Sequence, residues 1–271
     1  MLGSLEILWD SEKLAVPRGP KVRQLLSLLI LQPGSVVSHG SIVDELWGKE
    51  PPKTALSTVR THVYHLRQIL HQEIGERIPA TLIDTCSTGY VLRALPEQVD
   101  TQNFMLLARQ GEAALSSGNL VEGSHLLKKA LDLWRGGALS DITSGSVLTQ
   151  HVQHLEELYI RILQLRIGAD MQLGRHSHVA AELKRLVIRH PLNEWLHGQL
   201  ITALYHSGRR GDALRAYQEL RKILREELGL DPSPELQLVH QEILSNSGIC
   251  SMNFLPGILG DITGEPFRRA S

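Results

Sequence analysis

The chain has 271 residues, of which 42% are hydrophobic and 21% charged, and its formal net charge is −1. This composition is that of a globular protein with room for two domains, and it excludes a chain that is basic throughout, so any nucleic-acid-binding surface must be local. Cys86 and Cys250 are widely spaced, which argues against a disulfide framework or a zinc site. We expect neither a leader nor a membrane span, because no run of about eighteen apolar residues occurs, and these features favour the cytoplasm.

The N-terminal part of the chain predicts short strands, three helices and a closing hairpin. Residues 2–17 partly alternate apolar and polar side chains, which indicates strands. The predicted helices, bounded by proline, glycine or a capping serine (Ser38), cover residues 20–32, 39–47 and 54–72. Apolar pairs on either side of a turn near residues 87–89 predict a β-hairpin. This order is typical of a winged helix-turn-helix domain.

The third predicted helix has an unusual charge pattern, because residues 53–72 contain no Asp or Glu although the chain holds 29. On a helical wheel, its apolar stripe consists of Leu56, Val59, Val63, Leu66 and Leu70. Short hydrogen-bonding side chains and Tyr64 cover the opposite side, and Arg60 and Arg67 form one flank. An ordinary exposed face usually mixes both charges. We therefore expect contact with DNA, whose major groove accepts such a helix.

No catalytic or metal-binding motif accompanies this helix. His62 and His65 are spaced i,i+3, but their wheel angles differ by about 60° and no carboxylate or cysteine stands beside them, so a metal site is not expected. GxSxG, Walker A and GxGxxG patterns are also missing. The sequence therefore predicts neither an enzyme nor a bound cofactor.

The remainder of the chain predicts helices only. Residues 94–98 form a short proline-containing linker, and residues 99–247 read as helix pairs. Segments around Gly174 and Gly208 align with a spacing of 34 residues, and the segment around Gly118 aligns with both, which favours a tetratricopeptide-like repeat over unrelated amphipathic helices. Residues 248–271 are rich in Gly and Pro and predict a disordered tail.

These segments resemble a known family. GPKVRQLLSLLILQPGSVVS, IVDELWGKEPPKTALSTVRTHVYHLRQIL and DTCSTGYVL are similar to the N-terminal half of the Streptomyces antibiotic regulatory proteins, and HPLNEWLHGQLITALYHSGRRGDALRAYQEL is similar to their activation domain. The resemblance covers roughly residues 1–245. It implies a mainly α protein with an OmpR-type winged helix over residues 1–93 and an all-α, tetratricopeptide-like bacterial transcriptional activation domain over residues 99–247.

The resemblance also implies a function. It predicts a pathway-specific activator of an antibiotic or secondary-metabolite cluster, nucleoid-associated when bound to DNA. Such an activator binds direct repeats in promoters as a side-by-side dimer. It recruits RNA polymerase through the sigma factor and the alpha or beta subunits. The alternative is an interaction or ligand-sensing protein that uses the winged helix for docking.

Residue by residue, the resemblance makes residues 54–72 the recognition helix. The predicted DNA-binding residues are Lys53, Thr58, Arg60, Thr61, Tyr64, His65, Arg67, Gln68 and, in the wing, Thr88. The two arginines are expected to grip phosphates, and Thr61, Tyr64 and His65 to read bases. Thr88 stands where related domains often carry an arginine, which puts minor-groove reading by the wing in doubt. Receiver and nucleotide-binding domains are missing, so we expect control by protein level or by a partner.

Overall fold

The computed structural model describes residues 1–9, 12–74 and 82–245 of a mainly helical chain. Its contacts divide it into two compact units, Met1–Glu112 with His125–Leu163, and Ala113–Ser124 with the residues from Gln164 onward. Within the described ranges, no helix is both long enough and apolar enough to cross a membrane. The predicted tail, residues 248–271, lies outside the described residues.

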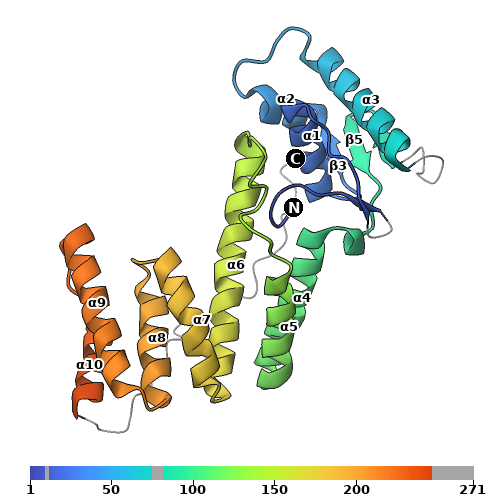
Figure 1. The fold of residues 1–271 in the computed structure, drawn as a ribbon. Helices are drawn as coiled ribbons and strands as arrows, with labels where there is room; N and C mark the ends of the chain where they lie inside the picture. Colours follow the sequence, from blue (N-terminus) through green and yellow to red (C-terminus); the bar gives the residue numbers. More distant parts are fainter. Residues whose placement is uncertain (10–11, 75–81, 246–271) are drawn as a thin grey trace. The chain divides into compact units, whose positions relative to one another are not determined.

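The three predicted N-terminal helices are present in the first unit: α1 (Pro20–Leu31), α2 (His39–Trp47) and α3 (Ala55–Ile74) (Figure 1). The expected cap of α2 is confirmed, because the Ser41 amide donates to the Ser38 hydroxyl at 3.0 Å. Gly48 ends the helix at φ 58°, a conformation that favours glycine. Local sequence signals therefore set the limits of α2.

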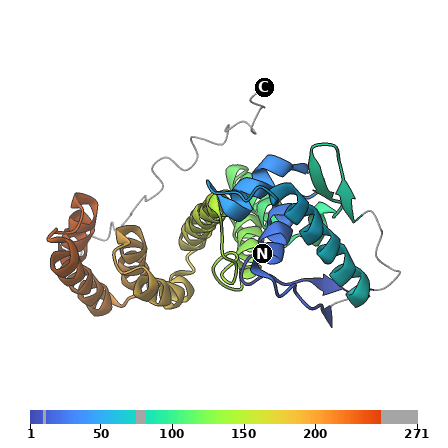
Figure 2. The ribbon, with the colours of Figure 1, turned by 90° about the horizontal axis from the view of Figure 1, so that it is seen from above.

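The predicted hairpin consists of β4 (Ile83–Thr85) and β5 (Gly89–Leu92), and β3 (Val36–Ser38), which the pattern did not indicate, completes an antiparallel sheet in the order β3-β5-β4. Gly89 allows β5 to approach β3, since a Cβ there would lie 1.9 Å from the Val37 carbonyl oxygen. Figure 2 shows the hairpin beside α3. Three helices followed by this hairpin confirm the winged helix-turn-helix fold.

The prediction of short strands over residues 2–17 is confirmed for part of the segment. The only strands in the described part of this segment are β1 (Leu8–Trp9) and β2 (Glu12–Lys13), paired with each other. Before them, the chain is irregular, and its backbone amides donate hydrogen bonds to carboxylates from much later in the sequence. The Leu2 amide donates to Asp100 at 3.0 Å and the Leu5 amide to Asp141 at 2.8 Å.

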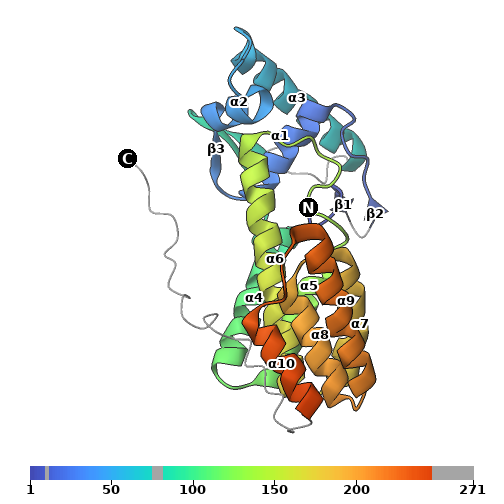
Figure 3. The ribbon, with the colours of Figure 1, turned by 90° about the vertical axis from the view of Figure 1, so that its left-hand side faces the viewer.

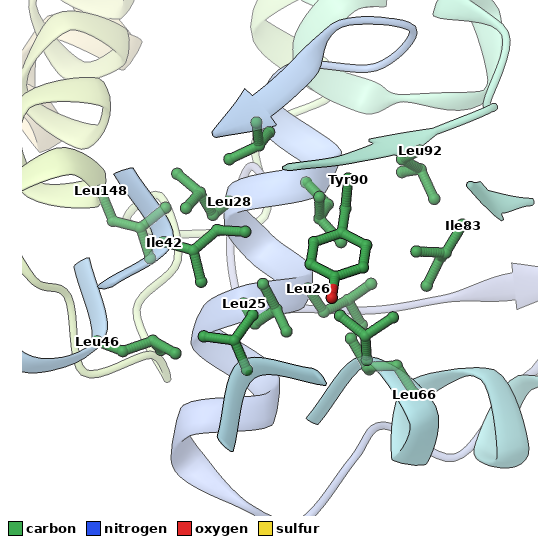
Figure 4. Close-up of a cluster of buried hydrophobic side chains, with 14 of the residues drawn as sticks. Leu25, Leu26, Leu28, Ile42, Leu46, Leu66, Ile83, Tyr90, Leu92 and Leu148 are labelled. Atoms are coloured by element: carbon green, nitrogen blue, oxygen red, sulfur yellow. The ribbon is translucent and has the colours of Figure 1, made fainter. Parts of the chain in front are cut away.

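Four more elements follow the hairpin: η2 (Pro96–Gln98), α4 (Asp100–Ser116), α5 (Leu120–Asp132) and α6 (Ser146–Gln172). The first unit contains a hydrophobic cluster in which Leu25, Ile42, Leu66 and Tyr90 come from the winged helix and Leu148 from the first turn of α6 (Figure 4). All five side chains are buried. The core of the winged helix is thus completed by a residue from a later helix.

A buried carboxylate lies at the edge of this core. Glu45 of α2 is only 2% exposed, and it accepts hydrogen bonds from the Gln24 amide group at 2.8 Å and from the backbone amides of Gly145 at 2.5 Å and Leu148 at 2.9 Å. Gly145 must be small, because a Cβ would lie 2.1 Å from the Glu45 carbonyl oxygen. Glu45 therefore caps the N-terminus of α6 from a distance of 100 residues in sequence.

The second unit contains α7 (His176–Arg189), α8 (Glu194–His206), α9 (Arg210–Leu228) and α10 (Pro234–Ser245), which pack side by side (Figure 3). Residues 196–204 of α8 are all buried, since α7 lies against one side and α9 and α10 lie against others. All three glycines of the repeat have positive φ and stand between consecutive helices: Gly118 at 81°, Gly174 at 72° and Gly208 at 74°. The helix pairs predicted by the repeat are present.

An ion-pair network is buried in the same unit. The Asp170 carboxylate, 4% exposed, accepts from Arg166 at 3.0 Å, from Arg175 at 2.7 Å and from the Ser124 hydroxyl at 2.7 Å. Arg166 also donates to Glu182 at 2.7 Å. Removing one partner of a buried ion pair leaves an uncompensated charge, which is strongly destabilising. The network therefore holds α6, which supplies Arg166 and Asp170, to α7, which supplies Glu182.

Candidate nucleic-acid interface

Helix α3 is held in the first unit by its apolar stripe. Val59, Val63, Leu66 and Leu70 are buried as predicted. Leu56 is not, since half of its surface is exposed although its wheel angle places it in the stripe. It belongs to the first turn of the helix, where Ala55 is buried instead. The stripe therefore anchors α3 from Val59 onward, while the first turn is held by Ala55 and not by Leu56.

The predicted base-reading residues lie on the exposed side of α3. Thr61, Tyr64, His65 and Gln68 are exposed, Tyr64 by 59%, and the rings of Tyr64 and His65 meet edge to face with centroids 5.9 Å apart. Thr58 is half-buried. This side of the helix thus presents a phenol, an imidazole, an amide and a hydroxyl together.

The hydroxyl groups of α3 are already oriented by the helix. Thr58 donates to the Thr54 carbonyl at 3.0 Å, and Thr61 donates to the Ser57 carbonyl at 3.1 Å. A hydroxyl has one hydrogen to donate and two lone pairs that accept. Because the hydroxyl hydrogen is bonded to the backbone, each of these oxygens can only accept a hydrogen bond from another group. Amino groups on base edges are donors that fit such oxygens.

Two cations flank this face. Lys53 precedes α3 and Arg60 lies on its second turn, and both are exposed. In the part of the chain that the structure describes, neither has a hydrogen-bond or ion-pair partner, and residues 53–72 include no acid that could neutralise them. Both charges are therefore available to phosphate groups.

His62 lies on the opposite flank, towards α1. It is half-buried, and burial, followed by the nearby charges of His65 and Lys21, lowers its pKa below the ordinary 6.5. The imidazole is therefore neutral at pH 7. Among the described residues, no three His, Cys, Asp or Glu side chains gather in a way that could hold a metal ion. His62 is a packing residue of α3.

Arg67 differs from Arg60 although both lie on the same flank. It is half-buried, its Nε donates to the Ile83 carbonyl at 3.0 Å, and its Nη2 donates to the same carbonyl at 2.5 Å and to the Thr85 hydroxyl at 2.8 Å. Two guanidinium nitrogens are thus committed to β4. No local sequence pattern predicts this contact, because its partners stand 16 and 18 residues further along the chain.

Thr88, the predicted wing residue, lies in the turn between β4 and β5. Its side chain is exposed, and its carbonyl accepts from the His39 amide at 2.9 Å. Within the turn, the Cys86 amide donates to the Gly89 carbonyl at 2.9 Å. Thr88 is therefore tied to the first residue of α2, while the side chains that join the hairpin to α3 are those of Arg67 and Thr85.

Comparison with known proteins agrees with this architecture. The family model of the bacterial transcriptional activator domain matches residues 99–244, and that of the C-terminal domain of transcriptional regulatory proteins matches residues 13–92. The chain is 40% identical over 247 residues to the regulatory protein DnrI of Streptomyces peucetius, with 90% of each chain covered.

Two further relatives are longer than this chain. It is 39% identical over 245 residues to the regulatory protein AfsR of Streptomyces coelicolor, which covers 90% of this chain and 24% of AfsR. The solved structure of Mycobacterium tuberculosis EmbR in complex with a low affinity phosphopeptide is similar with a TM-score of 0.78 and 32% identity, over 90% of this chain and 64% of that chain. The chain belongs to the Streptomyces antibiotic regulatory protein family, whose members are transcriptional regulators.

Proposed function

We propose that this protein is a sequence-specific DNA-binding activator of an antibiotic or other secondary-metabolite gene cluster, with α3 as its recognition helix. The observation that carries the proposal is the exposed side of α3, where polar side chains and two unpaired cations, Lys53 and Arg60, stand on a stretch with no acid. Because the chain as a whole has a net charge of −1, this concentration of positive charge is local.

The dimensions and chemistry of this face suit the major groove. An α-helix with its side chains is about 10–12 Å across, and the major groove is about 12 Å wide. Gln68 has the amide that pairs with both hydrogen-bonding atoms on the edge of adenine. Thr61 offers an acceptor oxygen, and Tyr64 combines an apolar ring with a hydroxyl. These side chains are assigned to base reading, with His65 beside Tyr64.

Lys53 and Arg60 are assigned to the DNA backbone, whereas Thr58, whose hydroxyl hydrogen is bonded to the Thr54 carbonyl, is assigned with Thr61 to accepting hydrogen bonds from base edges. Cations that neutralise phosphates release counterions, and each such contact adds about 0.9 to the slope of log affinity against log salt concentration. Thr88 stands on the exposed turn of the wing and is assigned to a neighbouring phosphate. These contacts set the position of the helix, while the exposed side of α3 selects the sequence.

At the promoter, two copies are expected to lie side by side on direct repeats about one helical turn, roughly 10–10.5 bp, apart. The helical C-terminal part would then contact RNA polymerase, through its sigma factor and the alpha or beta subunits. A regulator of this kind works on chromosomal DNA in the cytoplasm. Family membership supports this arrangement, and the winged helix supplies a surface with the required chemistry.

The test is a selection of duplexes from a random-sequence pool by the full chain, followed by footprinting of the enriched site. We expect a direct repeat, and we expect Arg60→Gln to weaken binding and lower the salt slope by about 0.9. The matched control is Arg109→Gln, which removes an exposed arginine from α4 and should leave the slope unchanged. If no duplex is enriched, the DNA-binding proposal is wrong and the winged helix is a docking module.

A further inference from the structure

The structure gives Arg67 a different environment from that of Arg60. Arg60 has no partner within the described part of the chain, whereas Arg67 holds the Ile83 carbonyl with two nitrogens and the Thr85 hydroxyl with one of them. Both partners belong to the wing strand β4. An arginine that grips phosphate needs free donors, and the N–H groups on Nε and Nη2 of Arg67 are engaged by β4.

The Ile83 carbonyl needs a partner because β4 is an edge strand. The sheet order is β3-β5-β4, so β4 pairs with β5 on one side only. Carbonyl groups on the other side of an edge strand have no ladder partner. Arg67 supplies that partner from α3, and its planar fork can reach the carbonyl and the Thr85 hydroxyl together.

The same short strand is braced internally. The Asp84 carboxylate accepts from Arg93 of the segment after β5 at 2.9 Å and from the Thr85 amide at 2.9 Å. The Arg93 hydrogen bond, then the Thr85 amide and the charges of Arg93 and Arg67, lower the pKa of Asp84 below its ordinary range. Asp84 is therefore ionised at neutral pH, and its ion pair with Arg93 joins β4 to the segment after β5.

We infer that Arg67 is a positioning residue, which locks the wing hairpin to the recognition helix, rather than a phosphate contact. This inference rests on the proposed DNA-binding function. By fixing β4 against α3, Arg67 acts together with the hydrogen bond from the His39 amide to Thr88 to set where the turn that carries Thr88 stands relative to the base-reading side chains. Its contribution to binding is preorganisation of two DNA-contacting elements, which adds affinity without adding a contact to DNA.

The first experiment measures the salt slope with the duplex enriched from the random pool. Arg67→Gln should weaken binding on the order of tenfold, the size expected for losing hydrogen bonds from a charged group, but the slope should stay within about 0.3 of the wild-type value. Arg67→Lys keeps the charge and loses the fork, so it should bind as weakly as Arg67→Gln. The control, Arg60→Gln, should lower the slope by about 0.9.

A second variant leaves Arg67 intact. Thr85→Val removes one acceptor of the lock with little change of shape, so it should weaken binding in the same direction by a smaller factor, again at constant slope. If Arg67→Gln lowers the slope as much as Arg60→Gln does, and Arg67→Lys binds like the wild type, Arg67 grips phosphate and the inference is overturned.

A readout without DNA separates this inference from the proposed function. Amide hydrogen exchange across residues 82–93 of the free protein should be faster in Arg67→Gln and Thr85→Val than in the wild type, with exchange in α1 unchanged. Unchanged exchange across residues 82–93 overturns the inference that Arg67 holds the hairpin to α3, whatever the DNA experiments show. Faster exchange in these variants, if the wild type enriches no duplex, would support the role of Arg67 in holding the hairpin and reject DNA binding.

Discussion

Removing the charge of Glu45 should loosen the joint between α2 and the first turn of α6. Glu45→Gln keeps the shape of the side chain but replaces one acceptor oxygen with an NH2 group. Three donors converge on the carboxylate, from Gln24, Gly145 and Leu148. The substitution therefore sets a donor against a donor in a site that is only 2% exposed.

The size of the effect follows from these contacts. A hydrogen bond to a charged group contributes about 1.5–3 kcal/mol, and a buried donor left unsatisfied costs about 1–3 kcal/mol. Removing a buried carboxylate also removes its own desolvation cost, which offsets part of the loss. We expect Glu45→Gln to lower the free energy of unfolding by about 2 kcal/mol, which corresponds to a fall in Tm of about 4–8 °C.

Calorimetry of the full chain measures the fall in Tm. Because two units need not unfold together, amide hydrogen exchange at Gly145 and Leu148 supplies the local measurement. Glu50→Gln is the control, since Glu50 is exposed just beyond α2 and its substitution should change stability by less than about 0.5 kcal/mol. A Glu45→Gln protein with the control's Tm and unchanged exchange at both amides would refute the reasoning.

Two other predictions concern single positions, and a third concerns the buried histidines. Gly89→Ala places a Cβ 1.9 Å from the Val37 carbonyl oxygen, so it should separate β3 from β5 and abolish DNA binding in a gel-shift assay. The control is Gly136→Ala, whose Cβ meets nothing within 4 Å and which should bind normally. Asp170→Asn leaves the buried Arg166 short of a counter-charge and should lower the free energy of unfolding by about 3–5 kcal/mol in a denaturant titration, against no measurable change for the exposed Asp132→Asn. Burial lowers the pKa of several histidines below 6.5, namely His62, His151, His176, His197 and His240. The unfolded chain therefore takes up protons first, so Tm should fall as the pH drops from 7.5 to 5.5 at constant ionic strength, and a rising Tm would contradict this assignment.

Local patterns predicted the elements whose causes are local. The limits of α2 follow from Ser38 and Gly48, and the hairpin follows from apolar pairs around a turn. The repeat glycines predicted the turns between helices because positive φ favours glycine wherever it occurs. Each of these signals acts within a few residues, so a single sequence contains it.

Features with distant causes could not be predicted in this way. The pattern of the first seven residues indicates a strand, but the amides of Leu2 and Leu5 donate hydrogen bonds to Asp100 and Asp141. No pattern near Leu2 or Leu5 predicts these distant partners. A helical wheel places Leu56 in the apolar stripe but cannot show that, in the first turn of α3, Ala55 is buried and Leu56 is half exposed. Likewise, it places Arg67 on the basic flank, while β4 determines what the guanidinium binds.

The shared core has a consequence for how such regulators can be recombined. Leu139 and Leu148, both beyond the C-terminal end of the winged helix, belong to the same hydrophobic cluster as Leu25 and Ile42. A chimera that swaps only residues 1–93 between two relatives would exchange most of this cluster but keep the foreign Leu139 and Leu148 that complete it. Exchange of DNA specificity should therefore succeed by replacing the exposed side of α3, or by carrying residues 138–152 along with the winged helix.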